Sequence, residues 1–177
     1  MNILIHHPVK LPVFQYGGTE RVVMWLCQTL HKMGHKVAVH AAPGSFMPDG
    51  IECLTDSVEV LKRAKEWDVC HGFTKPSPEM YDAFGNKVLV TIQGNGQLGE
   101  RFHKNTVFVS RNHAERHGAK VFVYNGLDPA ELKFNDQARS NRFLFLSKRL
   151  RKLFAEVAVR IRGDSGECER RKDAPFQ

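Results

Sequence analysis

Two adjacent glycines, Gly17 and Gly18, stand directly before a segment that begins at Thr19 and has helical spacing of apolar residues. Adjacent glycines let backbone N–H groups approach an anion closely, and a helix starting here directs the positive end of its dipole at the same point. A diphosphate suits such a loop. A tight turn with Thr19 as the helix N-cap is the structural alternative. The loop lacks the G-x-G-x-x-G and G-x-x-x-x-G-K spacings, which weighs against dehydrogenases and P-loop NTPases.

A second group of polar and small residues follows two apolar runs. His71 ends the run that begins at Asp68, and Gln93, Gly94 and Asn95 follow the run 87–92. An imidazole and two amides can hydrogen-bond the hydroxyl groups of a polyol, and glycine permits close approach. The sequence therefore predicts substrate contacts here, although a structural, hydrogen-bonded imidazole is an alternative for His71.

Metal-ligating and nucleophilic patterns are weak. Two histidine pairs are spaced four residues apart on predicted helices, His31 with His35 and His113 with His117, but no carboxylate or cysteine accompanies them at a recognisable ligand spacing. The four cysteines form no C-x-x-C pair: Cys27, Cys53, Cys70 and Cys168. We therefore expect no metal site, no cofactor and no disulfide framework, and we expect reduced, mostly buried thiols.

The elements that must position these residues alternate along the first part of the chain. Residues 1–138 switch between short apolar runs and amphipathic segments, which is typical of a layered α/β domain. We expect strands at 1–5, 36–41, 68–71, 87–92, 106–110 and 121–124. We expect helices at 19–33, 57–67 and 78–84 and around His113, with Gly34 as a left-handed cap that ends the first.

The expected strands are apolar throughout, as strands covered on both faces are. The sequence therefore predicts an α/β fold with a Rossmann-like parallel sheet and helices on both faces. Ligands of such sheets bind beyond the carboxyl ends of the strands. The loops at Gly17-Gly18 and Gln93-Gly94 should then face one cleft.

Composition and charge divide the chain in two. Its 177 residues are 42% hydrophobic and 25% charged, which fits one folded domain. The net charge is +7, and residues 139–177 hold 11 Lys or Arg against 5 Asp or Glu. Because the remainder is nearly neutral, nucleic-acid binding is not expected. A chain without a bilayer-length apolar run or a basic signal-like start is expected to be soluble and cytoplasmic.

We expect residues 135–177 to form a linker, a residual strand at 143–146, a helix at 149–162 and a basic tail. The helix has an apolar face bordered by Lys and Arg. Such a helix can lie on an anionic membrane surface, or its apolar face can pack back on the domain. An exposed tail also offers a contact for homo-oligomers. From Gly163 onward we expect a mobile segment.

Five motifs occur in order between residues 1 and 134, at Tyr16–Glu20, Leu30–Val37, Asp68–His71, Val109-Ser110 and Val123–Asp128. In this order they resemble the N-terminal, acceptor-side domain of a retaining glycosyltransferase of family four with the two-domain GT-B fold. The resemblance implies a hexosyltransferase-type transfer from a nucleotide diphosphate sugar to a hydroxyl acceptor, with no required metal.

The resemblance also implies roles for single residues. Gly17, Gly18 and Thr19 would lie against the donor diphosphate, and the domain would recognise the acceptor, with His71 and Gln93–Asn95 as its candidate contacts. No catalytic residue is assigned. Similar enzymes often carry a histidine where this chain has Gln93, and glutamine cannot transfer protons near neutral pH.

The pattern of such enzymes is lost after Ser147, where a second, donor-binding domain would continue. We therefore expect a single GT-B half with a truncated or altered second domain, and poor activity from this chain alone. The alternative function is a non-catalytic remnant or binding module for an acceptor or a partner protein.

Overall fold

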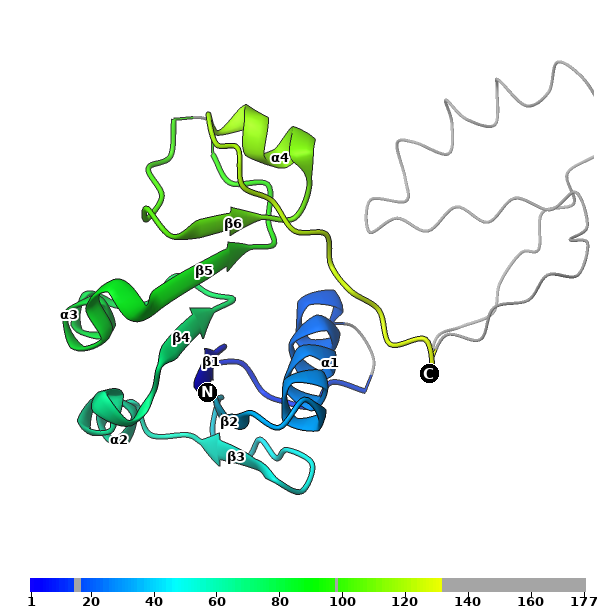
Figure 1. The fold of residues 1–177 in the computed structure, drawn as a ribbon, viewed down its shortest axis with the longest axis vertical. Coiled ribbons are helices and arrows are strands. Elements are labelled where there is room, and N and C mark those ends of the chain that lie inside the picture. The colour runs from blue at the N-terminus through cyan, green and yellow to red at the C-terminus, as the bar shows by residue number, and fades with distance from the viewer. Residues whose placement is uncertain (15–16, 98, 132–177) are drawn as a thin grey trace, which may run out of the picture. The chain divides into compact units, whose positions relative to one another are not determined.

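The computed structural model describes residues 1–14, 17–97 and 99–131, which belong to one compact unit, Met1–Phe134. Its centre is a six-stranded sheet (Figure 1). The strands are β1 (Asn2–His6), β2 (Lys36–His40), β3 (Ile51–Leu54), β4 (Val69–Gly72), β5 (Val88–Ile92) and β6 (Thr106–Phe108). Every pairing in the sheet is parallel.

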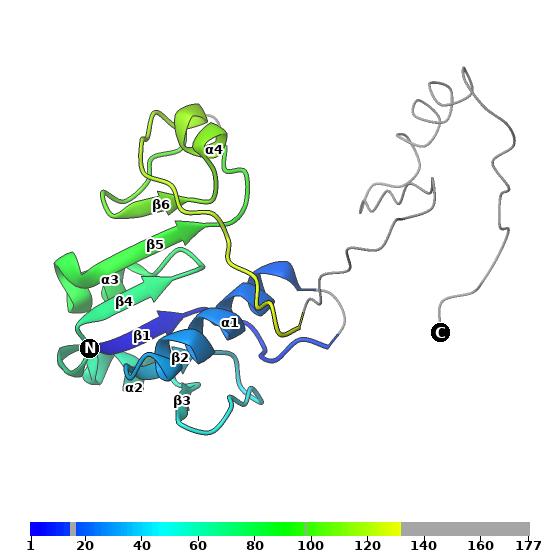
Figure 2. The same cartoon turned by 45° about the vertical axis from the view of Figure 1, so that its right-hand side comes forward.

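The strand order is β3-β2-β1-β4-β5-β6, so the first strand lies in the middle (Figure 2). On one side β1 pairs with β2, where His6 lies opposite His40. On the other side it pairs with β4, where Ile5 lies opposite His71. The order reverses at β1, and this is the point at which open α/β sheets bind ligands beyond their carboxyl ends.

Among the described residues, three α-helices and two short 3₁₀ turns lie between strands, and a fourth α-helix follows β6. They are α1 (Gly18–Lys32), α2 (Ser57–Lys62), α3 (Pro78–Phe84) and α4 (Arg111–Arg116), with η1 (Ala64–Glu66) and η2 (Gly85–Lys87). The side chains of Asp56, Ser77 and Ser110 cap the first turns of α2, α3 and α4 by accepting backbone N–H groups. α1 ends before Gly34, whose φ of 85° gives the left-handed cap that the sequence predicts.

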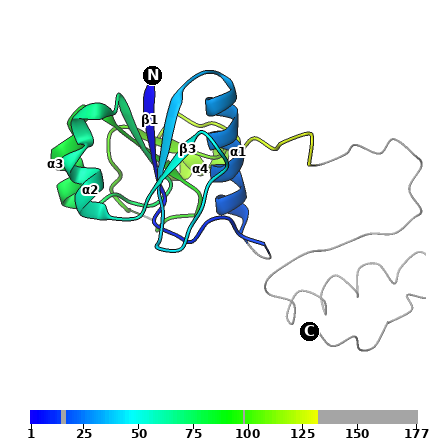
Figure 3. The same cartoon turned by 90° about the horizontal axis from the view of Figure 1, so that it is seen from below.

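The helices cover both faces of the sheet (Figure 3), with α1 on one side and α2 and α3 on the other. The apolar core is divided in the same way. Val23 and Cys27 of α1 pack with Ile5 and Val39 on one face. Trp67, which follows η1, packs with Leu4 and the α3 side chains on the opposite face. Burial of both faces explains why the strands read as continuous apolar runs.

The predicted α/β class and the Rossmann-like parallel sheet with helices on both faces are confirmed, with three local differences. The strand β3 was not expected. The helix expected at 57–67 divides at Arg63 into α2 and η1. The strand expected at 121–124 is reduced to a single parallel bridge between Phe108 and Phe122.

The predictions for the linker, the residual strand, the basic helix and the tail at 135–177 lie outside the described residues. Within the described part of the chain, no helix is long and apolar enough to cross a bilayer.

Candidate functional site

The first turn of α1 begins at the glycine pair. Gly17 is the N-cap residue, with a φ of 155° that L side chains rarely adopt, and Gly18 is the first helical residue. Thr19 lies inside the helix, so the N-cap role considered for it is wrong. No side chain caps this end of the helix. The first backbone N–H groups of a helix have no intrahelical acceptor, and they are therefore available to an anion.

The two glycines meet different surroundings. A Cβ on Gly17 would lie 2.6 Å from Val13 Cγ2 and 2.7 Å from Glu20 Oε2, whereas a Cβ on Gly18 would meet no atom within 4 Å. Gly17 is thus required by the local backbone, and Gly18 is not. The contact at Gly17 also shows that the Glu20 carboxylate lies over this residue, where a negative charge is favoured by the helix dipole.

His7 lies directly after β1 and is 4% exposed. Neither of its ring nitrogens has a hydrogen-bond partner among the described residues. Its ring makes an edge-on contact with Phe73, with 6.4 Å between centroids. Burial lowers the pKa of His7, and the negative charge of Glu20 opposes this shift.

His71, at the end of β4, is held by a hydrogen bond and an aromatic contact. Its Nε2 lies 2.8 Å from Thr91 Oγ1 on β5, and its ring lies 4.6 Å from that of Phe73. Burial lowers the pKa of His71 to about 4, so the imidazole is neutral at pH 7. A hydrogen-bonded imidazole, considered above as an alternative, is present, and Phe73 lies against both His71 and His7.

The loop after β5 is joined to a loop further along the chain. Gln93 Nε2 donates to Asn125 Oδ1 at 2.9 Å, and Asn125 Nδ2 donates to Gln93 Oε1 at 2.8 Å. This reciprocal amide pair brings together two of the loops identified from sequence. Because each side chain uses one donor and one acceptor in the pair, each still has one N–H and one lone pair for a hydroxyl group.

Asn95 and Gly96 connect the same loop to the end of α4. The Asn95 carbonyl lies 2.8 Å from Nε2 of His117. A Cβ on Gly96, whose φ is 63°, would lie 3.0 Å from that imidazole. The imidazole of His117 therefore supports the loop that carries Gly94 and Asn95, and glycine at position 96 allows the close approach.

The expected histidine pair on α4 forms part of an aromatic cluster. The rings of His113 and His117 lie 5.5 Å apart, and Phe108 contacts both. Among the residues that the structure describes, no three His, Cys, Asp or Glu side chains are grouped to hold a metal ion. The described cysteines, Cys27, Cys53 and Cys70, are free thiols.

A second pair of imidazoles at the same edge was not predicted. His6 and His40 are both buried, and their Nδ1 atoms lie 2.9 Å apart. His40 Nε2 lies 3.3 Å from Ser57 Oγ at the start of α2. Burial, with a smaller contribution from His40, lowers the pKa of His6 to about 4. The available signal was that both histidines end apolar runs, which places them side by side once those strands pair in parallel.

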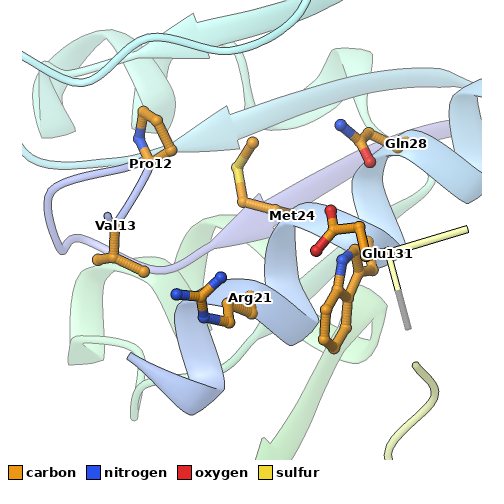
Figure 4. Close-up of a pocket in the computed structure, with 7 residues that line it drawn as sticks. Pro12, Val13, Arg21, Met24, Gln28 and Glu131 are labelled. Carbon is orange, nitrogen blue, oxygen red and sulfur yellow. The ribbon is translucent and has the colours of Figure 1, made fainter. Parts of the chain in front are cut away.

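The described structure therefore places the candidate residues at the carboxyl ends of three adjacent strands. Gly17, Gly18 and Thr19 follow β1, His71 ends β4, and Gln93, Gly94 and Asn95 follow β5. A small pocket of about 110 Å³ lies beside α1 (Figure 4). It is lined by Pro12, Val13, Arg21, Met24, Trp25, Gln28 and Glu131. None of the candidate residues lines this pocket.

Comparison with known proteins gives a likeness to solved structures but none to a family model or a curated sequence. No family model matches the chain, and no curated protein matches its sequence. Among solved structures the chain is similar to AviGT4, a glycosyltransferase involved in avilamycin A biosynthesis, with a TM-score of 0.58 and 18% sequence identity. The match covers 73% of this chain and 43% of AviGT4, so this chain spans less than half of that enzyme. The α/β fold of the described residues is a fold also found in a glycosyltransferase.

Proposed function

We propose that this domain forms the acceptor side of a glycosyltransferase that transfers a sugar from a nucleotide diphosphate sugar to a hydroxyl group. The observation that carries the proposal is the arrangement at the carboxyl edge of the sheet. The glycine loop and the first turn of α1 lie after β1, and hydrogen-bonding side chains lie after the neighbouring strands β4 and β5. The likeness in fold to a glycosyltransferase supports the same proposal.

Each part of this edge suits one part of the reaction. The backbone N–H groups at Gly17, Gly18 and Thr19 would bind the donor diphosphate. The amide pair of Gln93 and Asn125 would present a donor and an acceptor to the hydroxyl groups of the acceptor substrate. His71 would contribute a neutral imidazole, with Gly94 and Asn95 beside it. In this proposal no metal ion is needed to hold the diphosphate.

The proposed donor contacts are weak when they act alone. A solvent-exposed contact at a helix N-terminus contributes about 1 kcal/mol. Without contacts to the base and ribose, donor affinity should be roughly millimolar. Transfer also needs both substrates held together away from water, and such positioning contributes several kcal/mol to the barrier. We propose that a second domain supplies these contacts, and that this chain alone turns over poorly.

The test is a titration of the full chain with UDP-glucose and GDP-mannose, followed by NMR of the backbone amides. The expected result is weak binding that shifts the Gly17, Gly18 and Thr19 amides and is unchanged by EDTA. A sugar-transfer assay with hydroxyl acceptors should then show turnover far below about one per second. Shifts confined to residues remote from α1 would contradict the donor site, and micromolar affinity would contradict the need for a second domain.

A non-catalytic binding module is the second candidate. The observation that favours it is a set of exposed apolar side chains on one segment: Val121, Val123, Tyr124 and Leu127, each at least 60% exposed. Such a segment is typical of a surface that contacts an apolar acceptor or a partner protein. Binding of a glycoside or a protein by this segment, with no response to nucleotide sugars, would favour the module over the enzyme domain.

A further inference from the structure

The imidazole of His7 is the most unusual polar group near the proposed donor site. It is 4% exposed, and neither ring nitrogen has a hydrogen-bond partner among the described residues. Leaving a buried polar group unpaired is unfavourable, so such groups are rare in proteins and each calls for an explanation.

His7 directly follows β1, and the same connection leads from β1 into the first turn of α1. The Glu20 carboxylate acts on the His7 imidazole electrostatically, and one of its oxygens lies beside Gly17. The Glu20 carboxylate therefore links the imidazole after β1 to the N-terminus of α1. The imidazole is neutral at pH 7 because burial lowers its pKa.

We propose that His7 takes up a proton when the diphosphate of a nucleotide sugar binds at the first turn of α1. The inference rests on the proposed function, because it concerns the same donor site. A bound diphosphate brings two negative charges to the position that the Glu20 carboxylate now occupies, so the carboxylate must move away from Gly17. A proton from bulk water then converts His7 to an imidazolium, whose N–H donates to a phosphate oxygen.

Two other histidines at this edge are already hydrogen-bonded. His6, its neighbour in the chain, is bonded through Nδ1 to His40, and His71, across the ring of Phe73, is bonded through Nε2 to Thr91. Glu20 is the acidic group that acts on His7 from α1. Gln93 cannot titrate near neutral pH. His7 is therefore the side chain at this edge whose proton binding should respond to an added anion.

The experiment uses nitrogen-15 NMR of the histidine rings in the full chain, titrated with UDP-glucose and GDP-mannose up to about 10 mM at pH 6.5, a concentration set by the expected millimolar affinity. The diphosphate of these diesters carries no proton near this pH, so any proton taken up belongs to the protein. The expected result is a shift of both His7 ring nitrogens to the position of an imidazolium, together with shifts of the Gly17 and Gly18 amides.

The outcomes separate this inference from the proposed function. Amide shifts at Gly17 and Gly18 with a neutral His7 would overturn the inference and leave the donor site in place. No change at either glycine would overturn both. His7→Asn should bind the donor at least several-fold more weakly and with no proton uptake. The matched control is His113→Asn, which alters another buried imidazole with an unpartnered Nε2 and should leave the uptake unchanged.

A second variant keeps the test valid if His7→Asn does not fold. Glu20→Gln removes the carboxylate that competes with the diphosphate while retaining the length of the side chain. It should strengthen UDP-glucose binding several-fold, because like charges no longer share the helix N-terminus. An unchanged or weaker affinity would refute the displacement of Glu20, and with it the need for a compensating proton on His7.

Discussion

The glycine pair at the start of α1 should separate into one residue needed for folding and one needed for binding. Gly17 has a φ of 155°, and an added Cβ would lie 2.6 Å from Val13 Cγ2 and 2.7 Å from Glu20 Oε2. Gly18 has no such φ, and an added Cβ would lie in open space. The variants Gly17→Ala and Gly18→Ala therefore make the same chemical change at adjacent positions with different physical consequences.

The expected changes in stability follow from the backbone conformation at the two glycines. An L side chain in a backbone conformation of this kind costs about 1–3 kcal/mol, and the contacts with Val13 and Glu20 add little because both are side-chain ends that can move. Gly17→Ala should therefore destabilise the domain by about 2 kcal/mol. Gly18→Ala should be neutral or stabilise it by about 0.4–1 kcal/mol, since alanine restricts the unfolded chain.

Thermal and urea unfolding of the full chain, followed by circular dichroism, measures both values. The melting temperatures of the two variants should differ by roughly 8 °C for a unit of this size. Gly18→Ala should nevertheless weaken UDP-glucose binding several-fold, because its methyl group stands where the diphosphate would approach the helix. Equal losses of stability in the two variants, or a larger loss for Gly18→Ala, would refute the reasoning about the backbone. Unchanged binding by Gly18→Ala would refute the assignment of the loop.

Three further predictions concern stability. Gln93→Ala and Asn125→Ala should each lower the free energy of unfolding by about 1 kcal/mol. A double-mutant cycle should give a coupling energy of about 0.5–1 kcal/mol between the two residues. Purely additive losses would show that the reciprocal pair does not form in solution. Lowering the pH from 6.5 to 4 should destabilise the fold, because the pKa of His71 is about 6.5 in the unfolded chain but about 4 in the folded domain. The free energy of unfolding should fall by about 3 kcal/mol by pH 4. Urea titrations of His71→Asn should show a flatter pH dependence. Trp67→Ala should lower the free energy of unfolding by about 3–5 kcal/mol in the same assay, because the side chain is fully buried. Trp67→Phe should lower it less, since the indole N–H has no hydrogen-bond partner among the described residues.

Elements whose own residues show the spacing of a buried face could be predicted from the sequence. α1 was predictable because Val22, Val23, Leu26 and Leu30 recur at helical spacing and Gly34 ends the helix. β3 was missed because Ile51-Glu52-Cys53-Leu54 is short and interrupted by a charge, and only its pairing with β2 makes it a strand. The run 121–124 shows the converse, since Val121, Val123 and Tyr124 have high β propensity but remain exposed and form no ladder.

The candidate site was predictable in its position but not in its contacts. The rule that ligands bind beyond the carboxyl ends of parallel strands brings Gly17, His71 and Gln93 to one edge. It does not reveal that Gln93 pairs with Asn125, or that Glu20 lies over Gly17. Those contacts join side chains on different loops, and their partners depend on backbone positions that no local pattern encodes. His7 was missed for a related reason, because its burial results from tertiary packing that includes the contact of its ring with Phe73.

The central position of β1 determines the order in which the growing chain can complete its core. β1 pairs first with β2, whose His40 lies 34 residues after His6, and its other edge must wait for β4, in which Val69 pairs with Ile3. A nascent chain that has reached β3 can cover one face of its three strands with α1. The opposite face, which includes Leu4 and Ala38, stays uncovered until α2, Trp67 and α3 have been made. During that interval of synthesis the chain carries an open apolar surface, and this is the stage at which it is most exposed to aggregation and to capture by chaperones.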